Sequence, residues 1–478
     1  MYYKLNENFI LRGYERLPYA VINTQTGAAN FVGPEVFNAL ELCNGKIDVS
    51  MPVIPESVRE YIKLAENAGI ITPCEYPSDI NHNQEYKFYH ARYIRHAHWS
   101  ITGKCNYRCK HCYMSAPDAK MGELSHDTIM NIIQQLGDCG IMNVSLTGGE
   151  PLVRDDFLEI VDALLERDIN ITQIYSNGAL VNEKLLRELD KRNIHPEFNM
   201  SYDGAGWHDW LRGINGAEKI VDDAFKLCRD MGFKTGSEMC LHQHNKHTLR
   251  ESIKHLGSLG VSSLKVNPVS NTGEWAKNNF GQAINFKELF ALYLAYIPEY
   301  YQDNMPLSIM LGGLFAARMN EPDYFDIPVF KPDIDPEIFC ICGHARLVMY
   351  ISPEGRILPC MALAGMSDNI QNKFPVITQK SLPECLNNSF YMNFINTRAS
   401  EYLALNQICE KCKYSRHCFG GCRADALEHD PNNFMSKSPG TCEIFRGGWV
   451  DKVIKTVKQI RPNAYTPAFD SALWQDLR

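Results

Sequence analysis

The chain has 478 residues and a mass of 54.4 kDa, which is too long for one ordinary core and enough for about three domains. Its 48 basic and 56 acidic residues give a formal net charge of -8, so the sequence carries no basic footprint for nucleic acid or anionic lipid. Any macromolecular partner is therefore expected to bind through a motif and not through bulk charge.

The N-terminus and the apolar runs bear on where the protein works. Residues 1–8 lack the basic segment and apolar core of a secretory signal. The longest apolar run, residues 289–297, covers about nine residues and is too short to span a bilayer. Seventeen cysteines in a reducing compartment more often indicate metal binding than disulfides. We therefore predict a cytoplasmic protein that binds neither membrane nor nucleic acid.

Residues 1–85 are predicted to form a small separate domain. Three strand-like runs precede two helical stretches, at 9–12, 20–23, 29–32, 34–43 and 55–68 in that order. This order, with Leu42-Cys-Asn-Gly45 and the final Ala68-Gly-Ile-Ile, resembles the winged-helix-like PqqD domain that recognises precursor peptides. The resemblance implies that a leader peptide adds as a strand beside the third strand and packs against the last helix. The alternative is a winged-helix structural domain without a ligand.

A polar segment, residues 76–93, is predicted to be a linker, and a new pattern begins at His96. Six strand-like segments alternate there with amphipathic helical stretches, near 98–101, 143–146, 171–175, 198–201, 236–239 and 263–266. Repeated strand and helix units imply a parallel sheet whose functional loops follow the C-terminal ends of the strands. The pattern predicts an α/β domain over residues 95–275.

Three cysteines follow the first of these strands at C-x3-C-x2-C spacing: Cys105, Cys109 and Cys112. Thiolates are soft ligands suited to iron-sulfur clusters, and a four-iron cluster normally takes four of them. Three cysteines on one loop therefore leave one iron open, and an open metal position marks a reactive site. The alternative interpretation of the three cysteines is a zinc knuckle.

This spacing resembles the signature of the radical S-adenosylmethionine (SAM) superfamily. The resemblance implies a partial (β/α)6 barrel and an open iron that chelates the amino and carboxylate groups of SAM. It also implies reductive cleavage of SAM to a 5'-deoxyadenosyl radical, which abstracts a hydrogen atom from the substrate. His111, where the family more often has an aromatic residue, is expected to pack beside the cluster without binding iron.

The same resemblance points to residues that contact SAM. Gly148-Gly149-Glu150-Pro151 matches the motif that binds the amino group, because glycines permit close approach and a carboxylate accepts from ammonium. Residues after the third and fourth strands match positions for the ribose and carboxylate, although both are also ordinary turn sequences. The predicted cofactor-binding residues are Tyr113, Gly148, Gly149, Glu150, Pro151, Ser176, Asn177, Ser201 and Asp203.

Residues 276–335 lack a clear repeat and are predicted to form a bridging region that contributes substrate contacts. An apolar helix is expected over 286–297 and to end before Pro298. The prolines at 328, 332 and 336 predict an irregular segment near the end of the region. No residue in this region is assigned as a catalytic group.

A second group of eight cysteines lies between residues 336 and 445: Cys340, Cys342, Cys360, Cys409, Cys412, Cys418, Cys422 and Cys442. Eight is the number that closes two four-iron clusters. The order and spacing, with Gly355 before Cys360, resemble the SPASM domain. By that resemblance Cys340, Cys342, Cys360 and Cys422 hold one auxiliary cluster, and Cys409, Cys412, Cys418 and Cys442 the other. Paired zinc ribbons are the alternative, although only one Cys-x2-Cys hairpin is present. Residues 446–478 are predicted to form a closing helix and a tail.

Together these features predict a radical SAM enzyme that matures a ribosomally made precursor peptide. The expected cofactors are SAM and three 4Fe-4S clusters, and the expected partners are the precursor, bound at residues 1–85, and a one-electron reductant such as flavodoxin or ferredoxin. The expected reaction forms a thioether from cysteine sulfur to carbon, and the alternative is carbon-carbon cross-linking.

Two further interpretations stay open. Sulfatase-maturing enzymes resemble the barrel and both clusters, but they place an aspartate where this chain has Met361, and they lack the N-terminal domain. The other class is a non-catalytic iron-sulfur electron carrier or peptide-binding protein. A carrier needs no SAM site, so Gly148-Gly149-Glu150-Pro151 favours the enzyme.

Overall fold

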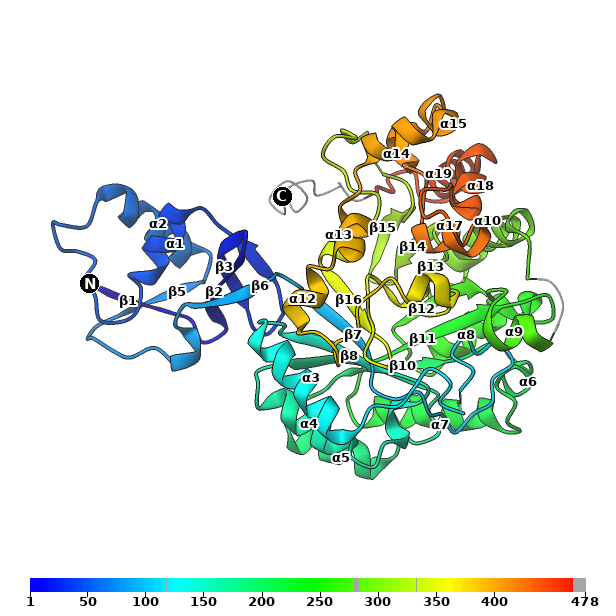
Figure 1. The fold of residues 1–478 in the computed structure, drawn as a ribbon, viewed down its shortest axis with the longest axis horizontal. Coiled ribbons are helices and arrows are strands. Elements are labelled where there is room, and N and C mark those ends of the chain that lie inside the picture. The colour runs from blue at the N-terminus through cyan, green and yellow to red at the C-terminus, as the bar shows by residue number, and fades with distance from the viewer. Residues whose placement is uncertain (117, 279–282, 332, 467–478) are drawn as a thin grey trace.

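The computed structural model describes residues 1–116, 118–278, 283–331 and 333–466. An eleven-stranded sheet forms the centre of the molecule, and residues 1–92 form a lobe at one side of it (Figure 1). The strand order of the sheet is β15-β14-β13-β12-β11-β10-β9-β8-β7-β16-β17. Within the described residues, no helix combines the length and apolar character needed to cross a membrane.

The six predicted strands form the middle of this sheet and are parallel to their neighbours. Their bounds are β7 His96–Ser100, β8 Asn143–Thr147, β9 Asn170–Ser176, β10 Glu197–Ser201, β11 Thr235–Leu241 and β12 Ser263–Pro268. Strands covered on both faces read as continuous apolar runs, and in β8 only Asn143 is not buried. The predicted α/β fold built on a partial barrel is confirmed.

Helices between these strands lie along one side of the sheet (Figure 1). Their bounds are α3 His126–Asp138, α4 Phe157–Leu165, α5 Glu183–Lys191, α6 His208–Arg212, α7 Ala217–Asp230 and α8 Leu249–Ser258. In α3 the side chain of Ser125 accepts a hydrogen bond from the Thr128 amide and caps the helix. Apolar residues three and four positions apart then bury one face of the helix.

Strands outside the predicted six extend the sheet in both directions. On one side lie β13 Ser308–Leu311, β14 Phe315–Arg318 and β15 Glu321–Asp326, and on the other β16 Val348–Ile351 and β17 Ile357–Leu358. Residues 276–335 are thus more regular than the sequence suggested. Helices α9 Gly273–Asn278 and α10 Phe286–Gln302 precede β13. The prediction that the helix ends before Pro298 is wrong, because buried Tyr300 and Tyr301 keep α10 packed on the core past the proline.

The N-terminal lobe holds two small sheets and two helices. Its elements are β1 Tyr2–Leu5, β2 Phe9–Glu15, β3 Leu17–Asn23, β4 Ala29–Phe31, α1 Pro34–Glu41, α2 Glu56–Asn67, β5 Ile71–Cys74 and β6 Lys87–Arg92. One sheet pairs β1 with β5, and the other has the order β4-β3-β2-β6. The expected linker at residues 76–93 is therefore wrong in its second half, where β6 pairs in parallel with β2. A parallel partner far away in sequence leaves no local signal in a polar segment.

A cluster of aromatic and apolar side chains joins the lobe to the barrel. Tyr14, Tyr89 and Tyr93 are buried together with Leu347, which precedes β16. The Tyr14 hydroxyl donates to the Gly140 carbonyl over 2.9 Å. The Phe31 ring lies 5.0 Å from the Tyr93 ring, edge to face. Phe31 therefore points into this contact and not outward from the edge strand.

The C-terminal part is a series of short helices that covers one end of the sheet (Figure 1). They are α11 Asp368–Gln371, α12 Leu382–Leu386, α13 Ser389–Asn396, α14 Ala399–Leu405, α15 Gln407–Glu410, α16 Ser415–Cys418, α17 Arg423–His429, α18 Pro439–Arg446 and α19 Trp449–Ile460. Helix α19 is the predicted closing helix, and it packs against α10. The predicted tail beyond residue 466 lies outside the described residues.

Candidate active site and cysteine clusters

The loop trio, defined as Cys105, Cys109 and Cys112, follows β7 at the C-terminal edge of the parallel strands. All seventeen cysteines of the chain are free thiols. Burial, with smaller contributions from the neighbouring Cys109 and Cys112 thiolates, raises the pKa of Cys105 to about 12, although the hydrogen bond from the Tyr107 amide opposes the rise. The Tyr107 amide donates to the Cys105 sulfur over 3.4 Å. The three thiols are thus close enough to influence one another's ionisation, as a common metal ligand set requires.

The Gly-Gly-Glu segment after β8 lies directly on the stem of this loop. The Gly149 amide donates to the Thr102 carbonyl and the Glu150 amide to the Lys104 carbonyl, each over 2.9 Å. A Cβ atom on Gly149 would come within 2.2 Å of the Lys104 carbonyl oxygen. Only glycine permits this approach, which places Glu150 close to the loop trio.

Glu150 is fully buried and is held by residues from the end of β9. Its carboxylate accepts a hydrogen bond from the Ser176 hydroxyl over 3.0 Å and another from the backbone amide of Asn177 over 2.7 Å. The Asn177 side chain donates to Asn106 over 2.7 Å and lies 3.9 Å from the Cys105 sulfur. Burial raises the pKa of Glu150 to about 7, although hydrogen bonds from Asn177, Leu152 and Ser176 oppose the rise. The predicted pair Ser176 and Asn177 therefore meets Glu150 in the fold.

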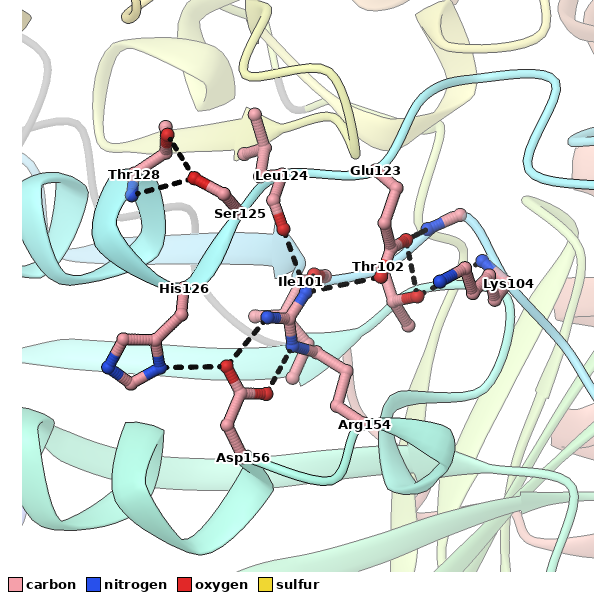
Figure 2. Close-up of polar contacts among 11 residues, drawn as sticks. Ile101, Thr102, Lys104, Glu123, Leu124, Ser125, His126, Thr128, Arg154 and Asp156 are labelled. Atoms are coloured by element: carbon pink, nitrogen blue, oxygen red, sulfur yellow. Dashed lines mark hydrogen bonds and ion pairs between the residues drawn. The ribbon is translucent and has the colours of Figure 1, made fainter.

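An ion-pair network not anticipated from the sequence fixes both ends of the loop that carries the trio (Figure 2). Arg154 binds Asp156 through two hydrogen bonds of 2.7 Å and donates to the carbonyls of Ile101 at 3.2 Å and Leu124 at 3.1 Å. Glu123 accepts from the Thr102 hydroxyl at 2.7 Å. Arg154 is nearly enclosed, so these charge-assisted bonds hold the loop ends to the start of α4.

Asp203 lies behind the trio, buried at the end of β10. Its carboxylate binds Arg212 of α6 at 2.6 Å and accepts from the Cys240 amide at 2.9 Å. Burial alone would raise the pKa of Asp203, yet the Arg212 guanidinium and the hydrogen bond to His208 hold it well below its usual range. Arg212 in turn reaches within 3.8 Å of the Cys109 sulfur. Both oxygens of Asp203 thus have protein partners, and Arg212 is the cation that touches the trio.

Other predicted residues surround the same site. Pro151 starts a buried 3-10 turn, Pro151–Val153, and Ser201 is the last residue of β10. The side chains of His111, Asp203 and Cys240 meet, and the atoms with which they could bind a metal lie within 4.8 Å of one another. Burial lowers the pKa of His111 to about 3, so its ring is neutral. No sequence signal distinguished Arg154 or Arg212, because their contacts with the loop that carries the trio, at Ile101, Leu124 and Cys109, are remote along the chain.

The eight C-terminal cysteines fall into two groups in the fold. The inner set is Cys340, Cys342, Cys360 and Cys422, and the outer set is Cys409, Cys412, Cys418 and Cys442. Burial and the thiolates of Cys360 and Cys422 raise the pKa of Cys342 well above its usual range. Cys340 differs from its set, since its sulfur lies 3.8 Å from Arg346 and 3.6 Å from the Asn396 carbonyl. The four thiols of the outer set line a cavity of about 220 Å³.

A larger cavity, of about 610 Å³, lies between the barrel and the C-terminal helices. It is lined by Tyr113, next to the loop trio, and by Cys422 of the inner set. Met361 and Glu428 also face it, and the Glu428 carboxylate accepts from the Ser270 hydroxyl over 2.8 Å. The cavity thus touches the inner set at Cys422 and reaches Tyr113, the residue next to Cys112 of the loop trio.

The donor sets fit iron-sulfur clusters. Each group offers three or four free thiols close to one another, and thiolates are the ligands that such clusters prefer. Burial raises the pKa of Cys360 to about 12, because it disfavours the charged thiolate. A bound metal group would supply the positive charge that stabilises this thiolate. The outer set encloses a cavity with room for a bound group.

Comparisons with known families agree with this geometry. Residues 99–256 match the radical SAM superfamily, and residues 342–413 match the SPASM iron-sulfur cluster-binding domain. The first match covers β7 to α8, and the second begins in the inner set and ends in the outer set. These two domains imply a SAM-binding 4Fe-4S cluster and auxiliary clusters.

Curated relatives extend over most of the chain. The PqqA peptide cyclase of Granulibacter bethesdensis is 23% identical over 329 residues, covering 68% of this chain and 82% of the relative. The subtilosin biosynthesis protein AlbA of Bacillus subtilis is 23% identical, and the match covers 76% of this chain and 73% of the relative. The AdoMet-dependent heme synthase of Nitratidesulfovibrio vulgaris is 25% identical, over 71% of this chain and 90% of the relative.

Solved structures share the fold. Streptococcus suis SuiB bound to S-adenosylmethionine has a TM-score of 0.61 at 15% identity, covering 92% of this chain and all of SuiB. The anSMEcpe structure with AdoMet has a TM-score of 0.58 at 16% identity, covering 77% of this chain and all of that one. Two family models match in the expected order, and each matched segment carries the thiol groups that its domain requires, so the chain contains a radical SAM domain followed by a C-terminal SPASM domain.

Proposed function

We propose that this enzyme cross-links a ribosomally synthesised precursor peptide by joining a cysteine sulfur to a carbon in a thioether. The observation that carries the proposal is the 610 Å³ cavity, which Tyr113 beside the loop trio and Cys422 of the inner set both line. A peptide segment in this cavity lies between the radical source and an auxiliary cluster. Support for a peptide comes from the PqqA peptide cyclases and from the fold shared with SuiB, which was solved bound to its precursor peptide SuiA.

The residues that would hold the cofactors follow from the three thiol groups. Cys105, Cys109 and Cys112 would bind the cluster with an open iron, and the inner and outer sets would each bind an auxiliary four-iron cluster. When bound, the cofactors supply one-electron cleavage of SAM to a 5'-deoxyadenosyl radical that abstracts hydrogen from the peptide. Arg154 and Arg212 keep the loop trio in place, the first through the loop ends and the second at Cys109.

The SAM contacts are proposed on the geometry around Glu150. Its carboxylate would accept the SAM ammonium, and Ser176 and Asn177 orient it through their hydrogen bonds. Tyr113 would border the ligand from the side of the cavity. Gly148, Gly149 and Pro151 shape the backbone around Glu150, and Ser201 lies on the neighbouring strand end. Asp203 would act indirectly by holding Arg212.

SAM affinity is expected to fall as the pH drops below about 7. The buried Glu150 has a pKa of about 7, and only its ionised form accepts from an ammonium group. Each pH unit below that pKa should therefore weaken SAM binding by roughly tenfold. Isothermal titration calorimetry of SAM binding, from one pH unit below to one pH unit above the pKa of Glu150, measures how steeply the affinity depends on pH. Glu150→Gln should bind SAM weakly and lose the slope, whereas Glu159→Gln on the exposed face of α4 should keep it. A pH-independent wild-type affinity would contradict the assignment.

The thioether assignment is tested on the product. Forming the bond removes one S–H and one C–H: one hydrogen atom leaves in 5'-deoxyadenosine, and one proton and one electron leave the peptide. The reconstituted enzyme should therefore release precursor that is two hydrogens lighter and has one fewer thiol open to alkylation. The same mass loss with all thiols still reactive would mean carbon-carbon cross-linking. Unmodified precursor, with full SAM cleavage, would argue against a peptide substrate.

Residues 1–85 are proposed to bind the leader of the precursor. The SuiB match covers 92% of this chain, so it includes much of the N-terminal lobe. Strand β4 is the free edge of its sheet. The Val32 amide donates to the Tyr19 carbonyl and the Asn23 amide to the Ala28 carbonyl, so in the antiparallel register the Ala29 and Phe31 backbone groups face outward. These free donors and acceptors suit the addition of a peptide strand.

Proline at Ala29 is expected to weaken leader binding without stopping SAM cleavage. It removes one outward N–H, and a lost backbone hydrogen bond is worth about 1 kcal/mol, or roughly fivefold in affinity. Ala29→Val keeps the donor and is the matched control. Phe31 is unsuitable for this test because its ring packs on Tyr93. Fluorescence anisotropy of labelled leader and 5'-deoxyadenosine formation without precursor are measured on the same samples. Equal affinity for the two variants would sink the leader role.

The proposed reaction also needs a one-electron donor, such as flavodoxin or ferredoxin, for SAM cleavage. It needs an electron acceptor after the cross-link forms. The inner set would provide that acceptor, because Cys422 lines the cavity in which the substrate radical arises.

A further inference from the structure

The cavity of the outer set opens at the surface of the molecule. Besides the four thiols, its lining includes Ile408 of α15, whose side chain is 74% exposed. Helices α14 and α15 form the outermost tip of the C-terminal region (Figure 1). The inner set, in contrast, contributes Cys422 to the substrate cavity. The outer set is thus bordered by exposed side chains of the C-terminal tip, where a second protein can approach it.

The tip carries an apolar centre that the fold itself does not cover. Leu405, at the end of α14, is 72% exposed, and it lies three residues from Ile408. Single exposed leucines are common on protein surfaces, but two large aliphatic side chains beside a cofactor cavity form a small apolar patch. Covering such a patch is favourable at roughly 25 cal/mol per Å² of apolar surface removed from water.

Basic residues surround this apolar centre. Lys411, Lys437 and Arg446 line the cavity of the outer set, and the lining described for it contains no carboxylate. Lys413 is exposed in the same segment, where Glu410 is the acidic neighbour. The whole chain carries a net charge of -8, so a basic rim here departs from the rest of the surface. An apolar centre within a charged rim is the usual composition of a transient protein interface.

We propose that this tip, defined as Leu405, Ile408, Lys411, Lys437 and Arg446, is the docking site of a small acidic one-electron carrier protein. The basic rim would steer a carrier of opposite charge, and the small apolar centre fits the weak, short-lived contacts of electron-transfer partners. The reduced carrier would give up one electron and become oxidised, and a cluster held by the outer thiols would accept that electron and pass it on towards the loop trio, where SAM cleavage consumes it. This inference rests on the proposed function only in requiring that the outer set binds such a cluster.

The test compares two electron sources on the same protein. Wild type and the variant Leu405→Asp/Lys411→Glu are reconstituted, and 5'-deoxyadenosine formation is followed without precursor. One series uses flavodoxin kept reduced by its NADPH-dependent reductase, and the other uses dithionite. The matched control is Lys219→Glu with Ile220→Asp on α7, since Ile220 is 37% exposed and Lys219 is also exposed. Iron content and flavodoxin affinity, by surface plasmon resonance, are measured for all three proteins.

The tip variant should lose about tenfold in flavodoxin-driven rate and in flavodoxin affinity, because it removes apolar contact and reverses a steering charge. Its iron content and dithionite-driven rate should match wild type, and the α7 control should behave as wild type throughout. Wild-type flavodoxin affinity in the tip variant would overturn the proposal. Loss of precursor affinity in the tip variant would also overturn the proposal, because the occupant would then be the peptide. Loss of a dimer that wild type forms in sedimentation would overturn it too, because the occupant would then be a second copy of the chain. None of these results depends on whether the peptide product is a thioether.

Discussion

Replacing Cys105, Cys109 and Cys112 together with alanine is expected to abolish SAM cleavage and to remove about a third of the bound iron, because one of three four-iron clusters loses all of its protein ligands. The three thiols lie on one loop, whose stem the Gly148-Gly149-Glu150 segment holds through backbone hydrogen bonds. The inner and outer sets are held by the C-terminal helices and should keep their iron.

Iron and sulfide analysis measures the loss of bound iron, and 5'-deoxyadenosine formation with dithionite measures SAM cleavage. Cys74→Ala is the matched control, because Cys74 is a partly exposed thiol in β5 of the N-terminal lobe, far from all three groups in sequence. It should keep full iron and full SAM cleavage. Retained SAM cleavage in the triple variant would refute the assignment of the loop trio. Loss of all iron would show instead that the three groups do not fold independently.

Replacing Cys342 with alanine is expected to abolish the cross-linked product and to leave SAM cleavage without precursor intact. Cys342 is enclosed with Cys360 and Cys422, so its loss disrupts the inner set next to the substrate cavity. The loop trio and Glu150 are untouched, because they belong to the barrel. The expected iron content is again lower by about one cluster in three.

Cys340→Ala gives the informative comparison with Cys342→Ala. We predict that both residues are ligands, since only then do eight thiols close two clusters. The Cys340 sulfur lies beside Arg346 and the Asn396 carbonyl in the structure, so ligation requires it to give up the contact with Asn396. Product analysis by mass spectrometry and iron analysis are run on both variants. Full iron and full product from Cys340→Ala would show that the inner cluster has an open or non-cysteine position.

The barrel was predictable from the sequence because its signals are local. Each buried parallel strand is a short apolar run, and each covering helix repeats its apolar residues every three or four positions, so both patterns are visible within a few residues. The three thiol groups were predictable for a similar reason. Ligand spacing on one loop reflects the geometry of the metal group, which is the same in every chain that binds it.

The contacts that complete the site depend on residues far apart along the chain. Strand β6 pairs with β2 across more than seventy residues, and β16 joins the sheet beside β7 from a segment about 250 residues later. No local period marks such a partner, because pairing depends on which surfaces the rest of the fold leaves uncovered. The same applies to Arg154, whose partners Glu123 and the Ile101 carbonyl come from a different loop.

The sequence by itself determined the cofactor chemistry: three thiols on one loop, a Gly-Gly-Glu turn one strand later, and eight further thiols. The tertiary structure decided where that chemistry can act. It packed Phe31 against Tyr93, engaged both oxygens of Asp203 within the protein, and opened one cavity to both Tyr113 and Cys422. The physical reason is that ligand identity is a property of residue types and spacing, whereas burial, charge pairing and cavities arise only when distant segments exclude water together.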